Sequence, residues 1–338
     1  LVDNDFYTGT EYPEGFVAVL ASTEAIDNYD FQLYDVATAA SLGDRNILSR
    51  GTLAADLDAE AESVLDYSTM NRSRGSGPAV GGFLLIGDTE ADQELCYITA
   101  ILGTNITVNR GALDTVPRNH VAGEAVWFIN ETANINDNTI RSATETIQYK
   151  VLPRTNNGVL SVLDADTLSV TVNERPWLPT RPANVTVAGV SFGNVDLGVT
   201  DPVPITWSER NRITEDTVFL PWDAATVAAE AGQTTKITLM KLDRTVVQEY
   251  TGLTGTSHNI DAVDFTEAQM ILRVDSEREG YTSWQGFEIG VTSLVGYYGL
   301  AYGFDYGGAD PEPPGEPGQI GTLYPDNPDA ETGNITGW

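Results

Sequence analysis

Apolar and polar residues alternate along most of the chain in short runs, a pattern typical of β-strands. Gly, Asn, Asp and Pro interrupt the runs at the spacing of sandwiches and barrels. The clearest runs cover residues 16–20, 31–34, 146–151 and 168–172. The pattern therefore predicts an all-β protein, and the changes of composition described below divide it into several domains.

Helical periodicity is scarce in the sequence. Residues 53–70 (LAADLDAEAESVLDYSTM) form one candidate helix, and residues 223–232 (DAATVAAEAG) form a short second one. Asp223 suits the N-cap of the second candidate, because its side-chain oxygen can accept a bond from a free N–H of the first turn. We expect these two helices as minor additions to the β-structure.

Composition shifts predict the domain boundaries of the first half. A Gly/Ser/Arg-rich joint at 71–78 precedes a compact unit of alternating strands at 79–129, and a polar stretch follows at 130–138. Because strands resume after that stretch, we expect 79–129 to be a small β-barrel inserted into a β-rich host domain. The host domain would consist of residues 1–78 and 130–176.

The second half reads as a linker, a sandwich and a tail. Residues 177–182 form a proline-rich linker, and residues 183–295 carry a clean sandwich pattern. Ile205 and Trp207 alternate inward on its second strand, so we expect them in the sandwich core. The tail at 296–338 is Gly/Tyr-rich and then Pro-rich and anionic, which predicts an extended segment.

The charge balance limits the classes of partner. The chain has 18 Lys and Arg against 49 Asp and Glu, for a formal net charge of −31. Such a field repels phosphate backbones and anionic lipid surfaces, so we expect no nucleic-acid partner. The apolar runs have the length of core strands and do not reach the ~18 residues of a membrane-spanning segment. The single Cys96 lies in an apolar run, where we expect it to be buried.

One of the two histidines, His120, lies among charged residues in the segment 107–128. Strand-like runs flank a loop that contains two glycines and a proline, and no serine or cysteine at a strained turn is near enough to act as a nucleophile. We expect Arg110, Gly111, His120 and Gly123 to build a structural turn, in which a His120 ring nitrogen bonds a loop carbonyl.

No segment combines the residues of a known catalytic or metal site. The alternating carboxylates of residues 56–62 lack the glycine and the later glutamate of an EF-hand loop, and no glycine loop suits a phosphate. With 49 acidic residues, some pair will always lie at the separation that sugar hydrolysis needs, so that signal decides nothing. We expect no catalytic residues, no metal and no cofactor, and therefore no enzyme.

The Gly/Tyr-rich end of the chain is the segment that most suggests a partner. Closely spaced aromatic side chains offer large, rigid contact surfaces. They could instead end the last sandwich strand and pack over its edge. The candidate contact residues are Tyr297, Tyr298, Tyr302, Phe304 and Tyr306.

Several segments, in this order, resemble the C-terminal region of phage tail-tip central hub or host-specificity proteins, of the long-tailed phage or gene transfer agent type. LVDNDFY, GFVAVLAS and FQLYD resemble the approach to its tail-domain start, and SRGTLAADLDAEAESVLD resembles its RGTLA segment. LCYITAILGTNITVNRGALDTVPRNHVAGEAVWF is similar to its small inserted barrel. ERPWLPTRPANVTVAG resembles its linker into a fibronectin-III-like module. ITWSERNR, EAGQTTKITL and EREGYTSWQGFEIGV resemble that module, and YGLAYGFDYGG is similar to its Gly/Tyr ending.

The resemblance implies a structural virion protein at the distal, extracellular end of a tail. Such proteins take part in tail assembly and host-cell attachment, usually as homotrimers about the tail axis. Their partners are other tail proteins, with a host surface receptor as a further possibility.

Two other function classes stay open. An extracellular carbohydrate-binding protein with a fibronectin-III-like module would expose a flat line of aromatic residues, for which Trp177, Trp222 and Trp284 are the candidates. A glycoside or peptidoglycan hydrolase would need an acidic pair buried deeply enough to raise one pKa.

Overall fold

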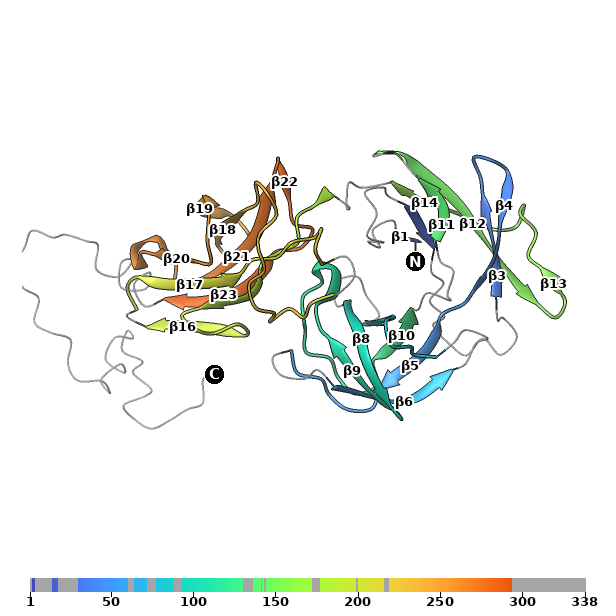
Figure 1. Ribbon diagram of the computed structural model, residues 1–338, viewed down its shortest axis with the longest axis horizontal. Helices are drawn as coiled ribbons and strands as arrows, with labels where there is room; N and C mark the ends of the chain where they lie inside the picture. The colour runs from blue at the N-terminus through green and yellow to red at the C-terminus, as the bar shows by residue number, and fades with distance from the viewer. Residues whose placement is uncertain are drawn as a thin grey trace, which may run out of the picture. The chain divides into compact units, whose positions relative to one another are not determined.

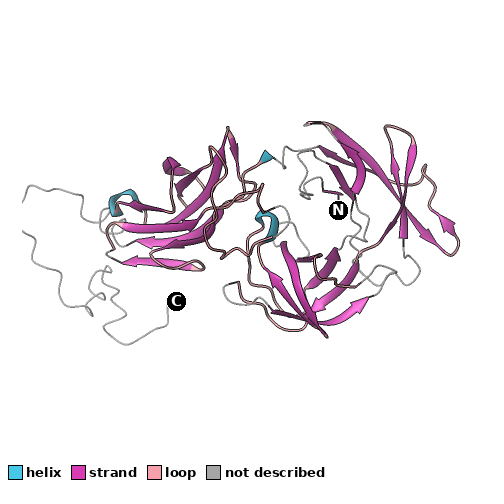
Figure 2. Cartoon of the chain, in the orientation of Figure 1, coloured by secondary structure: helices cyan, strands magenta, loops and turns pink. Residues whose placement is uncertain are grey.

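The structure, a computed structural model, is built almost wholly of β-strands (Figure 1, Figure 2). Within the described residues, helix is confined to short 3-10 turns such as η1 (Ala112–Asp114) and η4 (Ala262–Asp264). The predicted all-β, multidomain fold class is confirmed. The described residues are 2–3, 14–17, 30–59, 64–71, 77–87, 93–129, 136–140, 142, 144–171, 177–198, 200–215 and 219–293.

The first β-unit is a closed barrel (Figure 1). Closure leaves no unpaired edge strand, which removes a site of unwanted strand pairing. Alternate residues point inward, and Leu84, Ile98, Ile106 and Phe128 fill the interior. In the order of pairing, the strands are β10 (Ala125–Ile129), β5 (Ser49–Leu53), β6 (Val64–Asn71), β9 (Asn105–Asn109), β8 (Glu94–Leu102) and β7 (Phe83–Ile86).

Strand β10 is buried along its whole length. Val126 and Phe128 face the barrel interior, whereas Ala125, Trp127 and Ile129 belong to a second apolar cluster on the outer face. A strand with both faces covered needs no polar alternation. This explains why its sequence, AVWFI, is a continuous apolar run.

The barrel includes more of the chain than the predicted segment 79–129. Strands β5 and β6 come from the stretch that we assigned to the host domain and, over 53–70, to a helix. They pair with β10 and β9, so the barrel closes through their hydrogen bonds. The helix prediction was wrong, because pairing with distant strands outweighs the weak local preference of an Ala/Glu-rich run.

Strands from before and after the barrel share one sheet. β3 (Asp30–Asp35) pairs antiparallel with β12 (Thr146–Thr155), over a core that includes Phe31, Leu33 and Tyr149. Since β3 precedes the barrel strands and β12 follows them, the barrel interrupts the chain of this sheet. The other strands of the sheet are β4 (Ala40–Asn46), β13 (Gly158–Val159) and β14 (Thr167–Thr171). A separate small sheet contains β1 (Val2–Asp3), β2 (Glu14–Val17) and β11 (Asn136–Ile140).

The last described unit is a two-sheet sandwich with one continuous apolar core. Ile205 and Trp207 lie in this core and are 0% and 3% exposed. One sheet contains β15 (Ala183–Val187), β17 (Val203–Ser208) and β20 (Ser257–Ile260). The other contains β16 (Asn194–Gly198), β23 (Phe287–Ser293), β21 (Gln269–Arg278), β18 (Thr234–Met240) and β19 (Val246–Leu253), with β22 (Tyr281–Thr282) paired to β21.

Residues 223–232 are not helical, so the second helix prediction was also wrong. Glu230, near the end of this segment, is buried and forms ion pairs with Arg212 at 2.9 Å and Arg278 at 2.7 Å. These contacts hold the segment against residues distant in the sequence. They replace the local hydrogen bonds that an Ala-rich helix would have made.

Candidate functional site

The polar centre of the barrel is the carboxylate of Glu94, which is fully buried at the start of β8. Its Oε1 accepts hydrogen bonds from Arg110 Nε at 2.8 Å and from the Gly111 N–H at 3.1 Å. Its Oε2 accepts from Arg110 Nη2 at 2.5 Å and from the Arg118 N–H at 3.1 Å. The two oxygens are thereby occupied by a bidentate guanidinium and two backbone donors.

His120 joins Glu94 to Glu124. Its Nε2 lies 3.2 Å from Glu94 Oε2, and its Nδ1 lies 2.7 Å from Glu124 Oε2. The predicted bond from the ring to a loop carbonyl was wrong, because both ring nitrogens face carboxylates instead. The His120 backbone fixes the loop, through two hydrogen bonds with the Leu57 backbone at 2.8 and 2.9 Å. We call Glu94, Arg110, His120 and Glu124 the Glu94 cluster.

The surroundings of Glu94 keep its carboxyl group ionised. Burial raises the pKa of Glu94, but hydrogen bonds and charges from Arg110 and His120 outweigh that effect and hold the pKa at about 2. Burial, reinforced by the Glu94 charge, raises the pKa of the Cys96 thiol. Both groups lie wholly inside the protein, Glu94 as an ion-paired carboxylate and Cys96 as a buried thiol.

The two predicted turn glycines have different surroundings. Gly111 has a φ of 64°, and a Cβ there would lie 2.9 Å from Pro117 Cδ and 3.0 Å from the Thr115 carbonyl oxygen. Gly123 has a φ of 91° but no atom near its missing side chain. Both positions need the left-handed backbone that glycine adopts easily, and Gly111 also needs the space.

Neither Glu94 nor Glu124 was predicted from the sequence as a partner of His120. A usable signal was present for Glu94, because an acidic residue opens the otherwise apolar run ELCYITAIL. An acid on a buried strand needs a charged or hydrogen-bonding partner inside the same core.

The loop after Arg110 is held against the residues that lead into the sandwich. Arg181, from the predicted linker, is 4% exposed; its N–H bonds Asp114 Oδ1 at 3.0 Å and its Nη2 bonds the Thr115 carbonyl at 2.6 Å. Burial lowers the pKa of Arg181 to about 10, an effect that the Asp114 charge only partly offsets. The linker is therefore packed against the barrel loop through a buried charge.

Two further contacts support this junction. Asn109 Nδ2 donates to the Phe219 carbonyl at 2.7 Å, and the Trp222 N–H donates to the Arg110 carbonyl at 3.0 Å. The Phe219 ring packs 4.8 Å from Phe83 and 5.2 Å from Tyr97, between ring centroids. We call these contacts, together with those of Arg181, the barrel–sandwich junction.

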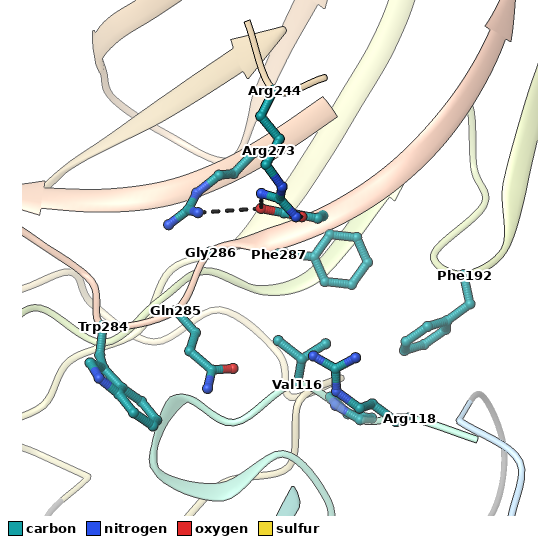
Figure 3. Close-up of a pocket in the computed structure, with 11 residues that line it drawn as sticks. Val116, Arg118, Phe192, Arg244, Arg273, Trp284, Gln285, Gly286 and Phe287 are labelled. Carbon is teal, nitrogen blue, oxygen red and sulfur yellow. Dashed lines mark hydrogen bonds and ion pairs between the residues drawn. The ribbon is translucent and has the colours of Figure 1, made fainter. Parts of the chain in front are cut away.

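A pocket of about 480 Å³ lies beside the junction, between the barrel loop and the sandwich (Figure 3). Its size is within the range of small-molecule sites. Arginine is its most frequent charged residue, so we call it the arginine pocket. It is lined by Val116, Pro117, Arg118, Phe192, Arg244, Arg273, Trp284, Gln285, Gly286, Phe287 and Glu288.

The upper wall of the pocket in Figure 3 is an ion-pair network on the sandwich. Arg244 donates to both oxygens of Glu288 at 2.9 Å, and Arg273 donates to Glu288 Oε1 at 3.3 Å. Arg273 also forms two bonds of 2.8 Å with Asp275. These bonds raise the pKa of both arginines; burial raises the pKa of Glu288, but the two arginines lower it overall.

The aromatic candidates for sugar binding are used in different ways. Trp222 is half-buried, with its ring 4.7 Å from Phe192, and the half-buried Trp177 accepts a hydrogen bond from Arg278 on its carbonyl. Trp284 is 38% exposed and lines the arginine pocket. Of the three, Trp284 is the one that a pocket ligand would contact.

Some predicted features lie outside the described residues, namely Tyr297, Tyr298, Tyr302, Phe304 and Tyr306. Over the described part of the chain, no group of three or more His, Cys, Asp or Glu side chains is arranged to hold a metal ion. No helix among those residues has the length and apolar character needed to cross a bilayer.

Comparison with known proteins gives no family assignment. No protein-family model matches the chain, and no curated protein does. A solved structure of a biofilm-associated protein (BSP domain) has 15% identity and a TM-score of 0.20, over 73% of this chain and 30% of that chain.

Two further solved structures contain fibronectin-III modules. The fibronectin(III)-like modules of Clostridium thermocellum CbhA have 10% identity and a TM-score of 0.20, over 71% of this chain and 86% of that chain. The FN1–FN3 domains of chicken CNTN1 have 8% identity and a TM-score of 0.20, over 72% of this chain and 67% of that chain. Likenesses at this level carry no argument about function.

Proposed function

We propose that this protein is a structural component of a phage tail tip, in which stiff β-domains carry a surface for host-cell attachment. The observation that carries the proposal is the barrel–sandwich junction. The buried Arg181 bonds Asp114 and Thr115, so a segment that looks like a free linker is fixed to the barrel loop. Fixed connections between domains suit a protein whose role is to hold a shape under load.

Two other features support the same role. The Glu94 cluster satisfies its charged groups inside the barrel, which suits a purely structural function. The net charge of −31 keeps the protein away from the nucleic acid that a virion carries. The sequence resemblance to tail-tip hub and host-specificity proteins is the reason for proposing a phage tail as the particle.

The proposed partners are other tail proteins and further copies of this chain, as a homotrimer about the tail axis. A surface receptor of the host is the proposed target of attachment. Within the C-terminal segment 296–338, the Gly/Tyr-rich part that contains Tyr302 and Phe304 is the proposed region of contact with these partners.

The test is to locate the protein in particles. Antibodies raised against the full chain are applied to particles purified from cultures of the source organism and viewed by immunogold electron microscopy. Gold at the distal end of tails is the expected result, with antibodies against an unrelated β-sandwich as the control. Labelling of free protein without any particle would overturn the proposal.

A second candidate is an extracellular carbohydrate-binding protein. The observation that favours it is the exposed Trp284 beside the arginines of the pocket. The two candidates differ in location, since the second predicts secreted protein that sediments separately from particles.

A further inference from the structure

We propose that the arginine pocket binds an acidic saccharide, with a carboxylate of the ligand held by Arg118 and a sugar ring stacked on Trp284. This inference deepens the proposed attachment role and rests on it for its biological meaning.

Arg118 is the arginine that a ligand can engage. In the described part of the chain its guanidinium makes no ion pair or hydrogen bond, and the side chain is exposed. The Arg118 backbone, in contrast, is fixed: its N–H bonds Glu94 and its carbonyl accepts a bond from Arg110. A rigid backbone thus presents a free guanidinium to the pocket. Figure 3 shows Arg118 across the pocket from Arg244 and Arg273.

The opposite wall is oriented before any ligand arrives. Arg244 adopts a left-handed φ of 67°, and its two bonds to Glu288 hold the guanidinium in place. Arg273 is held by Asp275 and Glu288. Each guanidinium has more N–H groups than these bonds use. Donors that are already oriented lose less entropy when they bind a ligand.

Gly286 allows the pocket floor to lie close to this network. A Cβ at Gly286 would overlap Asp275 Oδ1 and would lie 2.5 Å from Arg273 Nε. Any larger residue would displace the Arg273–Asp275 pair.

The charge of the pocket selects the class of anion. Three guanidinium groups, of Arg118, Arg244 and Arg273, meet two carboxylates, of Asp275 and Glu288, which leaves one positive charge in excess. The chain as a whole is strongly acidic, with a net charge of −31, so at long range it repels a dianion about twice as strongly as a monoanion. A singly charged carboxylate matches this excess and suits the planar fork of arginine.

Trp284 and Gln285 account for the saccharide part of the ligand. The indole, 38% exposed, offers an apolar face on which the C–H face of a pyranose can pack. Gln285 lines the pocket beside it and can both donate to and accept from sugar hydroxyls. Phe192 and Phe287 close the side of the pocket opposite to Trp284 in Figure 3.

The experiment titrates the full chain with methyl glycosides of glucuronic, galacturonic and N-acetylneuraminic acid, by saturation-transfer NMR and calorimetry. The methyl ester of each acid serves as its uncharged control. We expect at least one acid to bind ~10-fold or more tightly than its ester, because charge-assisted bonds to Arg118 are lost in the ester. Added salt should weaken the binding.

Variants locate the binding. Arg118→Gln and Trp284→Ala should each weaken the affinity ~10-fold. Arg154→Gln is the matched control, because the Arg154 side chain is partly exposed (36%) but lies on β12, paired with Asp44, and its removal changes the net charge equally. Arg154→Gln should leave the affinity unchanged.

Three results would overturn the inference: equal binding of all acids and esters, equal weakening by Arg154→Gln and Arg118→Gln, or no binding of any acid. Tighter binding of a glycerol-phosphate glycoside than of every acid would show that the ligand class is wrong. Soluble glycosides test saccharide binding by the pocket alone, so their failure to bind would not contradict the proposed location on phage tails. Absence of gold on tails would, in turn, not contradict saccharide binding by the pocket.

Discussion

The Glu94 cluster and the arginine pocket both combine arginine with glutamate, but they differ in whether every guanidinium group has a partner inside the protein. In the barrel, Arg110 is 2% exposed and its guanidinium bonds Glu94, the Asp58 carbonyl and the Arg118 carbonyl. In the pocket, Arg118 is exposed and its guanidinium has no partner among the described residues. The first arrangement uses its donors inside the protein, whereas the second leaves them for a ligand.

The difference shows that arginine next to carboxylate is not by itself a functional signal. A buried pair is costly to break because a charge is left without water or a partner. An exposed pair contributes little to stability, since solvent screens it. Substitutions in the Glu94 cluster should therefore lower the stability strongly and those in the arginine pocket only weakly. Ligand affinity should instead depend on the arginine pocket.

The largest effect is expected at Glu94. Glu94→Gln leaves the buried Arg110 without its counter-charge and should lower the free energy of unfolding by about 3–5 kcal/mol. Glu288→Gln, which removes one partly exposed carboxylate from the pocket network, should cost about 1 kcal/mol or less. Urea denaturation, followed by tryptophan fluorescence, measures both.

A double variant sharpens this comparison. Glu94→Leu combined with Arg110→Met removes both charges and should recover part of the stability that Glu94→Gln loses, because Arg110 is no longer left as a buried charge without its counter-charge. The recovery is incomplete, since the Gly111 and Arg118 N–H groups lose their acceptor. Equal losses for Glu94→Gln and Glu288→Gln would refute the distinction between the two regions.

The pH dependence should be the next largest effect. The pKa of Glu94 falls from 4.5 to about 2 on folding. Because the folded state holds this carboxyl ionised, its contribution is complete above about pH 4.5 and disappears as the pH falls toward 2. The pKa difference corresponds to roughly 3 kcal/mol. Between pH 4.5 and 2 the free energy of unfolding of the wild type should fall by this amount relative to that of the double variant, which lacks the titrating carboxyl, and parallel pH profiles would contradict the assignment.

The two turn glycines give a matched pair. Gly111→Ala adds backbone strain and a contact with Pro117 Cδ at 2.9 Å, so it should cost about 2–4 kcal/mol. Gly123→Ala adds backbone strain alone and should cost about 1 kcal/mol. Thermal unfolding of the two variants measures the difference. If Gly123→Ala cost as much, the close approach of Pro117 would not matter.

The sequence predicted features that depend on local alternation. The all-β class, the interrupted sheet of β3 and β12 and the burial of Cys96 all follow from short apolar runs. The barrel boundary did not follow, because β5 and β6 belong to the barrel only through pairing with β10 and β9. The two helix predictions were wrong for the same reason: contacts with residues distant in the sequence outweigh the weak helix propensity of each local run.

The site residues divide in the same way. His120 and Arg110 could be identified from the sequence because they lie in one polar loop. Glu94, which contacts His120, is 26 residues away in the sequence and was not predicted as its partner. The arginine pocket brings Arg118 together with Arg273 and Glu288, and no local pattern marks that meeting. Packing between the barrel loop and the sandwich creates the pocket, so only the folded chain reveals it.

The smallest stability effect should occur at Arg118, and it tests the comparison most directly. Arg110 and Arg118 are eight residues apart and bear the same side chain. Arg110→Gln should destabilise the protein by about 3 kcal/mol or more, because it leaves Glu94 buried without its main partner. Arg118→Gln should change stability by less than about 0.5 kcal/mol, since the contacts of residue 118 with the cluster come from its backbone. A large loss at Arg118, measured by the same urea titration, would mean that its side chain supports the fold, and the pocket would then be part of the structure rather than a site kept free for a ligand.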